Sequence, residues 1–148
     1  MSAPQIVIID PYLELAEYLA DEARDLGFST VIERTEDATA LRRAAESADA
    51  VIVDTVHFGA QWLDLAPNPE TLGTGPVAIL TGACDVPALE LDAGFCRVLG
   101  VRVSGILPKP LDQAEVTLAL RATLWAARAR AAARPSIQWP DADGGRDD

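Results

Sequence analysis

The sequence is poor in basic residues, in cysteine and in long apolar runs. Its 148 residues include 12 Lys and Arg against 23 Asp and Glu, which gives a net charge of −11. Proteins that bind duplex nucleic acid hold its phosphates with clustered Lys and Arg, so this balance argues against nucleic acid as a direct partner. The one basic cluster, Arg121 to Arg134, lies in an Ala-rich segment and leaves nucleic-acid contact there as a minor alternative.

The two cysteines, Cys84 and Cys96, are too few for a disulfide scaffold and lack the spacing of a metal knuckle. We expect both to be buried free thiols. No apolar run approaches the ~20 residues that cross a bilayer. The first residues, MSAPQIVIID, place no basic segment ahead of the apolar run, so they do not have the pattern of a signal peptide. We therefore expect a cytoplasmic protein with no membrane partner.

The length suits one ordinary domain with its own core. Short apolar runs predict five strands, at 5–10, 29–34, 50–54, 76–82 and 101–107. Apolar residues at helical spacing predict helices at 12–26, 35–47, 86–99 and 111–133. The segment 55–75 has no regular pattern beyond a helical turn or two around 61–66. We expect the domain to span 5–133 and the polar tail, 134–148, to be disordered.

Capping residues support three of the helix boundaries. Gly27 stands where the first helix should end, and Asp85 stands ahead of 86–99 as an N-cap. Asp112 and Glu115 have the spacing of a capping box at the start of the last helix.

The strands alternate with helices, and their apolar runs indicate burial on both faces. The predicted fold class is therefore α/β, a parallel sheet covered by helices on both sides. In such sheets, functional groups collect at the carboxyl ends of the strands. Asp10, Asp54 and Thr81 end three of the predicted strands, and Lys109 follows the fifth. Two acids, a hydroxyl and an amine are thus expected at one edge of the sheet.

Each of these residues has a plainer interpretation when taken alone. Asp10 and Asp54 are equally well explained as caps of the turns or helices that follow them. Thr81 precedes Gly82 and suits a turn, and Lys109 between two prolines suits a solvated loop. Their joint occurrence at four strand ends is what favours a functional site.

The ordered set of stretches IVIID, AVIVD, VAILTG and GILPKPLD resembles the receiver domains of two-component response regulators, over roughly residues 5 to 130. The resemblance implies a flavodoxin-like, doubly wound sheet of five parallel strands in the order 2-1-3-4-5. It also implies a single-domain response regulator receiver in phosphorelay signal transduction, a signalling domain rather than an enzyme.

The resemblance assigns a role to each strand-end residue. Asp54 would be the nucleophile that accepts the phosphoryl group. Mg²⁺ would be held by the carboxylates of Asp10 and Asp54 and by the backbone carbonyl of Val56. Lys109 would hold a phosphate oxygen, and Thr81 would move toward the phosphoryl group and report its arrival.

The sequence departs from the usual receiver pattern at positions that bear on this chemistry. Most receivers have two adjacent acids after the first strand, whereas Asp10 is followed by Pro11. A site with one acid fewer is expected to hold Mg²⁺ more weakly. Ile106 stands where an aromatic switch residue is common. These departures favour an alternative, a degenerate receiver that acts as a phosphorylation-independent binding or dimerisation module.

Two other classes fit the sequence less well. A phosphatase of the haloacid dehalogenase type would need a second acid two residues after its nucleophile. Two residues after Asp54 the chain has Val56, which is not an acid. A cobalamin-binding domain would need Asp-x-His-x-x-Gly, and DTVHFG has those letters at the wrong spacing. Neither is pursued.

Few residues follow Ala133, so we expect no output domain and an action by docking. The expected partners are a histidine kinase or histidine phosphotransferase upstream and a target protein downstream. The resemblance also implies a docking and dimer surface on the last helix, the fifth strand and the helix at 86–99. Leu118, Leu124 and Trp125 are the candidates for an exposed apolar stripe on the last helix, through which a homodimer would form.

Overall fold

The computed structural model describes residues 3–33, 46–58, 75–82 and 85–133. Five parallel strands form one sheet in the order β2-β1-β3-β4-β5, which confirms the predicted flavodoxin-like topology. The strands are β1 (Gln5–Ile9), β2 (Ser29–Glu33), β3 (Ala50–Asp54), β4 (Val77–Thr81) and β5 (Arg102–Leu107).

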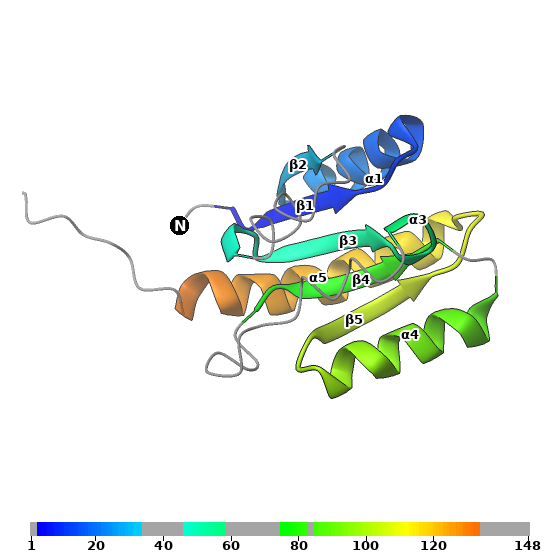
Figure 1. Ribbon diagram of the computed structural model, residues 1–148. Coiled ribbons are helices and arrows are strands. Elements are labelled where there is room, and N and C mark those ends of the chain that lie inside the picture. The colour runs from blue at the N-terminus through cyan, green and yellow to red at the C-terminus, as the bar shows by residue number, and fades with distance from the viewer. Residues whose placement is uncertain (1–2, 34–45, 59–74, 83–84, 134–148) are drawn as a thin grey trace, which may run out of the picture.

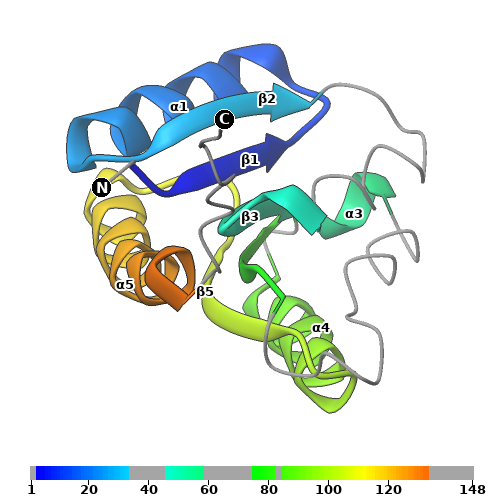
Figure 2. The ribbon, with the colours of Figure 1, turned by 90° about the vertical axis from the view of Figure 1, so that its left-hand side faces the viewer.

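Helices cover both faces of this sheet. They are α1 (Leu13–Leu26), α3 (Thr55–Phe58), α4 (Val86–Val98) and α5 (Gln113–Ala133). Figures 1 and 2 show α1 and α5 against one face and α4 against the other. The predicted strands and the three long helices all form within two residues of their predicted bounds. Helices lie on both faces because each central strand is apolar on both faces and must be covered twice.

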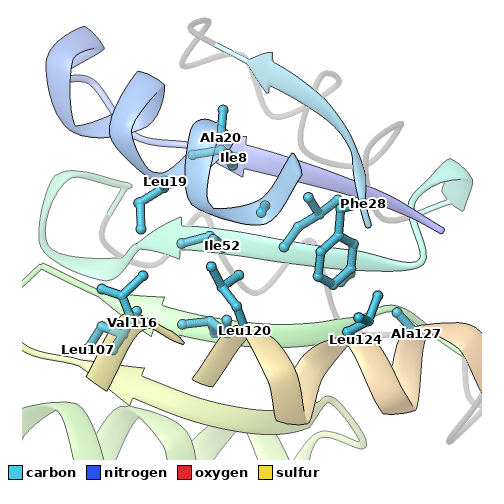
Figure 3. Packing of buried hydrophobic residues seen from close by; sticks show 14 of the residues in the cluster. Ile8, Leu19, Ala20, Phe28, Ile52, Leu107, Val116, Leu120, Leu124 and Ala127 are labelled. Atoms are coloured by element: carbon cyan, nitrogen blue, oxygen red, sulfur yellow. The ribbon is translucent and has the colours of Figure 1, made fainter. Parts of the chain in front are cut away.

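The α5-side core lies between the sheet and the helices α1 and α5. Ile8, Ile52 and Ile79 of the three central strands contribute to it, together with Leu19 of α1 and Leu120 of α5. Figure 3 shows Ile8, Ile52, Leu19 and Leu120 in this cluster. Successive strand residues point to opposite faces, so the neighbours of these isoleucines fill the other layer.

The α4-side core lies between the sheet and α4. Val53, Leu80 and Leu89 are fully buried in it, and Cys96 of α4 is buried beside them. Cys96 is a free thiol, as predicted. Burial and the nearby Asp92 raise the pKa of this thiol to about 11, despite the opposing charge of Arg97.

The predicted caps form at all three helix ends. Gly27 ends α1 with a left-handed φ of 113°, and its N–H donates to carbonyls of the last turn. The Asp85 carboxylate accepts from the N–H of Ala88 at 3.3 Å. The Asp112 carboxylate accepts from the N–H of Glu115 at 3.1 Å. These bonds satisfy backbone groups that a helix end leaves without intrahelical partners.

Two sequence predictions need correction. The chain becomes helical at once after Asp54, since α3 begins at Thr55, where no regular element was expected. Leu124 is buried, with 8% of its surface exposed, and does not belong to an exposed stripe. It stands four residues after Leu120 and therefore shares the face that packs on the sheet (Figure 3).

Several predictions fall outside the described residues. These are most of the helix at 35–47, the turn at 61–66, the free thiol of Cys84 and the disordered tail at 134–148. Across the part of the chain that is described, no helix is both long and apolar enough to cross a membrane.

Candidate functional site

The four predicted site residues lie at one edge of the sheet. Asp10 directly follows β1, Asp54 ends β3, and Thr81 ends β4 in direct register with Asp54. Lys109 follows β5 by two residues and reaches back over the edge. Its Nζ lies 2.7 Å from Asp54 Oδ2 and 3.0 Å from Asp10 Oδ2. One ammonium thus joins two carboxylates that stand 44 residues apart in the sequence.

Lys109 is the only lysine in the chain. Its side chain is 16% exposed, and those of Asp10 and Asp54 are 1% and 4% exposed. Burial by itself would lower the pKa of Lys109. The hydrogen bonds and charges of Asp54 and Asp10 outweigh burial, so the pKa of Lys109 is raised above its ordinary value. Lys109 is therefore a permanent cation at neutral pH.

Asp10 is both a turn residue and a site residue. Its Oδ1 accepts from the N–H of Tyr12 at 2.8 Å, while its Oδ2 accepts from Lys109. The Tyr12 ring then stands over the ammonium, with 4.9 Å between Lys109 Nζ and the ring centroid. The plain interpretation of Asp10 as a turn residue is thus confirmed, and the same carboxylate also contacts Lys109.

The role of Tyr12 was not predicted from the sequence. The signal was present, because an Asp two residues before a backbone N–H commonly closes a turn of this kind. Such a turn fixes the direction of the residue that follows it.

Thr81 is fully buried, and its hydroxyl has no hydrogen-bond partner among the described residues. A buried hydroxyl without a partner is costly, so such a group commonly serves a second state or a ligand. The backbone carbonyl of Thr81 accepts from the Thr55 hydroxyl at 3.3 Å, which ties the end of β4 to the start of α3.

Gly82 lies so close to the Asp54 side chain that a Cβ has no room there. A Cβ built on Gly82 would lie 2.7 Å from Asp54 Oδ1 and 3.1 Å from the backbone nitrogen of Val56. Gly82 also has a φ of 129°, a conformation that residues with a Cβ rarely adopt. The role of Gly82 was not predicted from the sequence, since it depends on the side chain of another strand.

The donor set of this edge fits Mg²⁺. Carboxylate and carbonyl oxygens are its preferred protein ligands, and it commonly uses one or two carboxylates while keeping several waters. Asp10 and Asp54 supply the carboxylates, and the backbone of Val56 lies close to Gly82 on the same side as Asp54 Oδ1. Within the described ranges, no group of three or more His, Cys, Asp or Glu could hold a metal ion, so this is a two-acid site.

Comparisons with known proteins give matches to solved structures. No protein-family model and no curated protein matches the chain significantly. The signal receiver domain of an HD domain-containing protein from Pseudomonas fluorescens Pf-5 is 25% identical with a TM-score of 0.62, over 86% of this chain and 98% of that one. A response regulator from Colwellia psychrerythraea is 15% identical with a TM-score of 0.63, over 86% and 99%.

A third similar structure is a response regulator receiver protein from Burkholderia phymatum. It is 20% identical with a TM-score of 0.60, and the match covers 84% of this chain and 95% of that one. The strand order and these three structures indicate the same fold. The chain has the fold of response regulator receiver domains.

Proposed function

We propose that this receiver domain accepts a phosphoryl group on Asp54 and that the modification switches a protein–protein interaction. The observation that carries the proposal is the contact of one partly buried ammonium with both strand-end carboxylates, at 2.7 and 3.0 Å. A lysine that serves only solubility is exposed on the surface and is not held between two carboxylates.

The chemistry follows from the positions of the two Asp54 oxygens. Oδ2 accepts from Lys109, and Oδ1 lies on the side of Gly82. Oδ1 attacks the phosphorus of the donor, an O–P bond forms, and the bond from phosphorus to the donor breaks, with its electron pair leaving on the donor. Lys109 stays protonated and balances the added negative charge.

Mg²⁺ would be held by Asp10, Asp54 and the Val56 carbonyl, and when bound it would screen the repulsion between phosphate and carboxylates. Thr81 is the proposed reporter of the modification. Its buried hydroxyl, which has no partner among the described residues, gains one by donating to a phosphoryl oxygen. Such a gain is enough to bias a two-state element at the end of β4.

The test is incubation with Mg²⁺ and acetyl phosphate, followed by intact-mass measurement. The wild type is expected to gain one phosphoryl group, and Asp54→Asn is expected to gain none. Asp85→Asn is the matched control, because Asp85 is an acid that caps α4 outside the site. Absence of an adduct on folded wild type, with Mg²⁺ in excess, would contradict the proposal.

A degenerate receiver that binds partners without phosphorylation is the second candidate. It is favoured by the two-acid site, since within the described residues no third acid stands beside Asp10 and Asp54. In that case Lys109 is the resident counter-ion of the site, and Lys109→Met should weaken partner binding whether or not a phosphodonor is present.

The proposed partners are a histidine kinase or histidine phosphotransferase, which supplies the phosphoryl group, and a downstream target protein. A homodimer is proposed through α4, β5 and α5. The large apolar side chains of these helices that are more than half exposed are Leu91, Phe95, Val98, Leu118 and Trp125. Burial of such a group on association is favourable in proportion to its apolar area.

Light scattering tests the dimer. The wild type is expected to have twice the mass of Trp125→Ala, and Tyr12→Ala, an exposed aromatic away from these helices, should behave as the wild type. Equal monomer masses for wild type and Trp125→Ala would contradict the dimer.

A further inference from the structure

An irregularity in β5 lies between its first residues and Lys109. Ala78 of β4 pairs with Val103, but the next residue of β4, Ile79, pairs with Gly105. Ser104 is therefore an extra residue in the edge strand, opposite no partner of its own. An extra residue of this kind is a β-bulge, and bulges are common next to active sites because they redirect the chain.

Side-chain directions confirm that the bulge changes the alternation of the strand. Val103 and Ile106 both pack on the α4-side core, although they are three positions apart, a spacing that puts two residues of a regular strand on opposite faces. On the other face, Ser104 contacts Thr123 of α5, and a Cβ on the neighbouring Gly105 would lie 3.2 Å from Ala119 of the same helix. Two consecutive residues thus face α5, which a regular strand does not allow.

Hydrogen bonds hold the extra residue in place. The hydroxyls of Ser104 and Thr123 lie 2.6 Å apart, and Ser104 Oγ lies 3.4 Å from the carbonyl oxygen of Ala78. The Thr123 hydroxyl donates its single hydrogen to the carbonyl of Ala119 at 2.6 Å, so Ser104 is the donor between the two hydroxyls. The single Ser104 hydrogen is then used on Thr123, and the 3.4 Å approach to the Ala78 oxygen is a packing contact. Thr123 is fully buried.

The bulge decides where the end of β5 points. Removing one residue from the register would turn Ile106 and Leu107 to the opposite faces and displace the following chain by about 3.3 Å. Lys109 Nζ holds its two carboxylates at 2.7 and 3.0 Å, so a displacement of that size would break both contacts.

We propose that the Ser104–Thr123 hydroxyl pair is a positioning device that fixes the bulge of β5 and thereby holds Lys109 against Asp10 and Asp54. The position of Lys109 follows from the contacts above, and the consequence for phosphoryl transfer rests on the proposed function. Neither residue touches the reacting atoms. Both act through the register of the strand.

The test uses Lys109 as a reporter, because it is the only lysine and selective isotope labelling gives a single side-chain signal. In the wild type, an NMR cross-peak is expected between the ε-methylene of Lys109 and the Tyr12 ring, since Nζ lies 4.9 Å from the ring centroid. Acetylation of the Lys109 amine by acetic anhydride, followed by peptide mass, measures the same contact chemically.

Thr123→Val keeps the shape of the side chain and removes the hydroxyl. We expect it to lose the cross-peak and to acetylate Lys109 about fivefold faster, the effect of one lost hydrogen bond. Thr123→Ser restores the hydroxyl and should restore both readouts. Thr117→Val on the same helix is the matched control, and Ser104→Ala is the milder second variant if Thr123→Val does not fold.

A cross-peak and an acetylation rate unchanged in both Thr123→Val and Ser104→Ala would overturn the proposal. Loss of the cross-peak in Thr117→Val as well would also overturn the proposal. The effect would then follow from any loss of a threonine hydroxyl on α5 and would not be specific to Thr123. These readouts need no phosphodonor. A wild type that shows the contact but gains no phosphoryl group would contradict the proposed function and leave the positioning device supported.

Discussion

The two ends of β3 each carry a buried acid paired with a base, yet the two sites are built differently. At the amino end, Asp49 is fully buried, accepts from the backbone N–H of Gln5 at 2.9 Å, and lies 3.5 Å from Arg130 of α5. At the carboxyl end, Asp54 shares one ammonium with a second acid. Between them, Ala50 to Val53 are wholly buried.

The difference lies in what surrounds each acid. Asp49 stands directly before β3, accepts from the backbone of β1 and pairs with Arg130 of α5. It therefore joins the start of β3 to the first strand and to the last helix. Asp54 has Gly82 close beside one oxygen, where a Cβ would not fit, and a buried Thr81 hydroxyl on the adjacent strand. Two carboxylates with one cation also leave a net negative charge. The contacts of the amino end are within the fold, whereas the carboxyl end carries the site for which we propose phosphoryl transfer.

Neutralising each acid in turn tests this contrast and has the largest expected effect. Asp49→Asn removes the charge opposite a largely buried Arg130 and should lower the free energy of unfolding by about 3 kcal/mol. Asp54→Asn leaves Lys109 paired with Asp10 and removes a like-charge repulsion, so it should change the free energy by less than about 1 kcal/mol. Urea unfolding at pH 7 measures both.

The two substitutions are matched in chemistry, so each is the control of the other. Equal losses of stability at the two ends would contradict the distinction between a structural and a functional acid.

Gly82→Ala sharpens the description of the carboxyl end. The added Cβ would strain a backbone with φ of 129° and lie 2.7 Å from Asp54 Oδ1. We expect a loss of about 1–3 kcal/mol in the free energy of unfolding and a slower reaction with acetyl phosphate. Gly94→Ala is the control, since a Cβ there would meet nothing within 4 Å. An unchanged reaction rate would show that phosphoryl transfer to Asp54 does not depend on a residue without a Cβ at position 82.

The smallest expected effect is a pH dependence that arises from Lys109. Its pKa is raised above the ordinary value of 10.5, so its contribution to stability is fully present below about pH 10.5 and is lost as the pH rises through the folded-state pKa. Relative to Lys109→Arg, which keeps its charge, the wild type should lose stability in urea unfolding above that pH. A constant difference between the two proteins would contradict the ion pairing.

The sequence was sufficient to predict the sheet and the four strand-end residues, because both follow from local patterns. Apolar runs such as 50–53 identify buried strands, and parallel strands bring their carboxyl ends to one edge. Gly82, Tyr12 and the Ser104–Thr123 pair were missed, since their roles depend on atoms of other elements. Leu124 was misplaced because a stripe was proposed without counting which face Leu120 occupies.

The most direct measurement locates the phosphoryl group. After reaction with acetyl phosphate and Mg²⁺, borohydride reduction converts an aspartyl phosphate to homoserine, which peptide mass spectrometry identifies by position. We expect homoserine at position 54 in the wild type and at no position in Asp54→Asn. Homoserine at position 10, or no homoserine in folded wild type, would contradict the assignment of Asp54 as the phosphoryl acceptor.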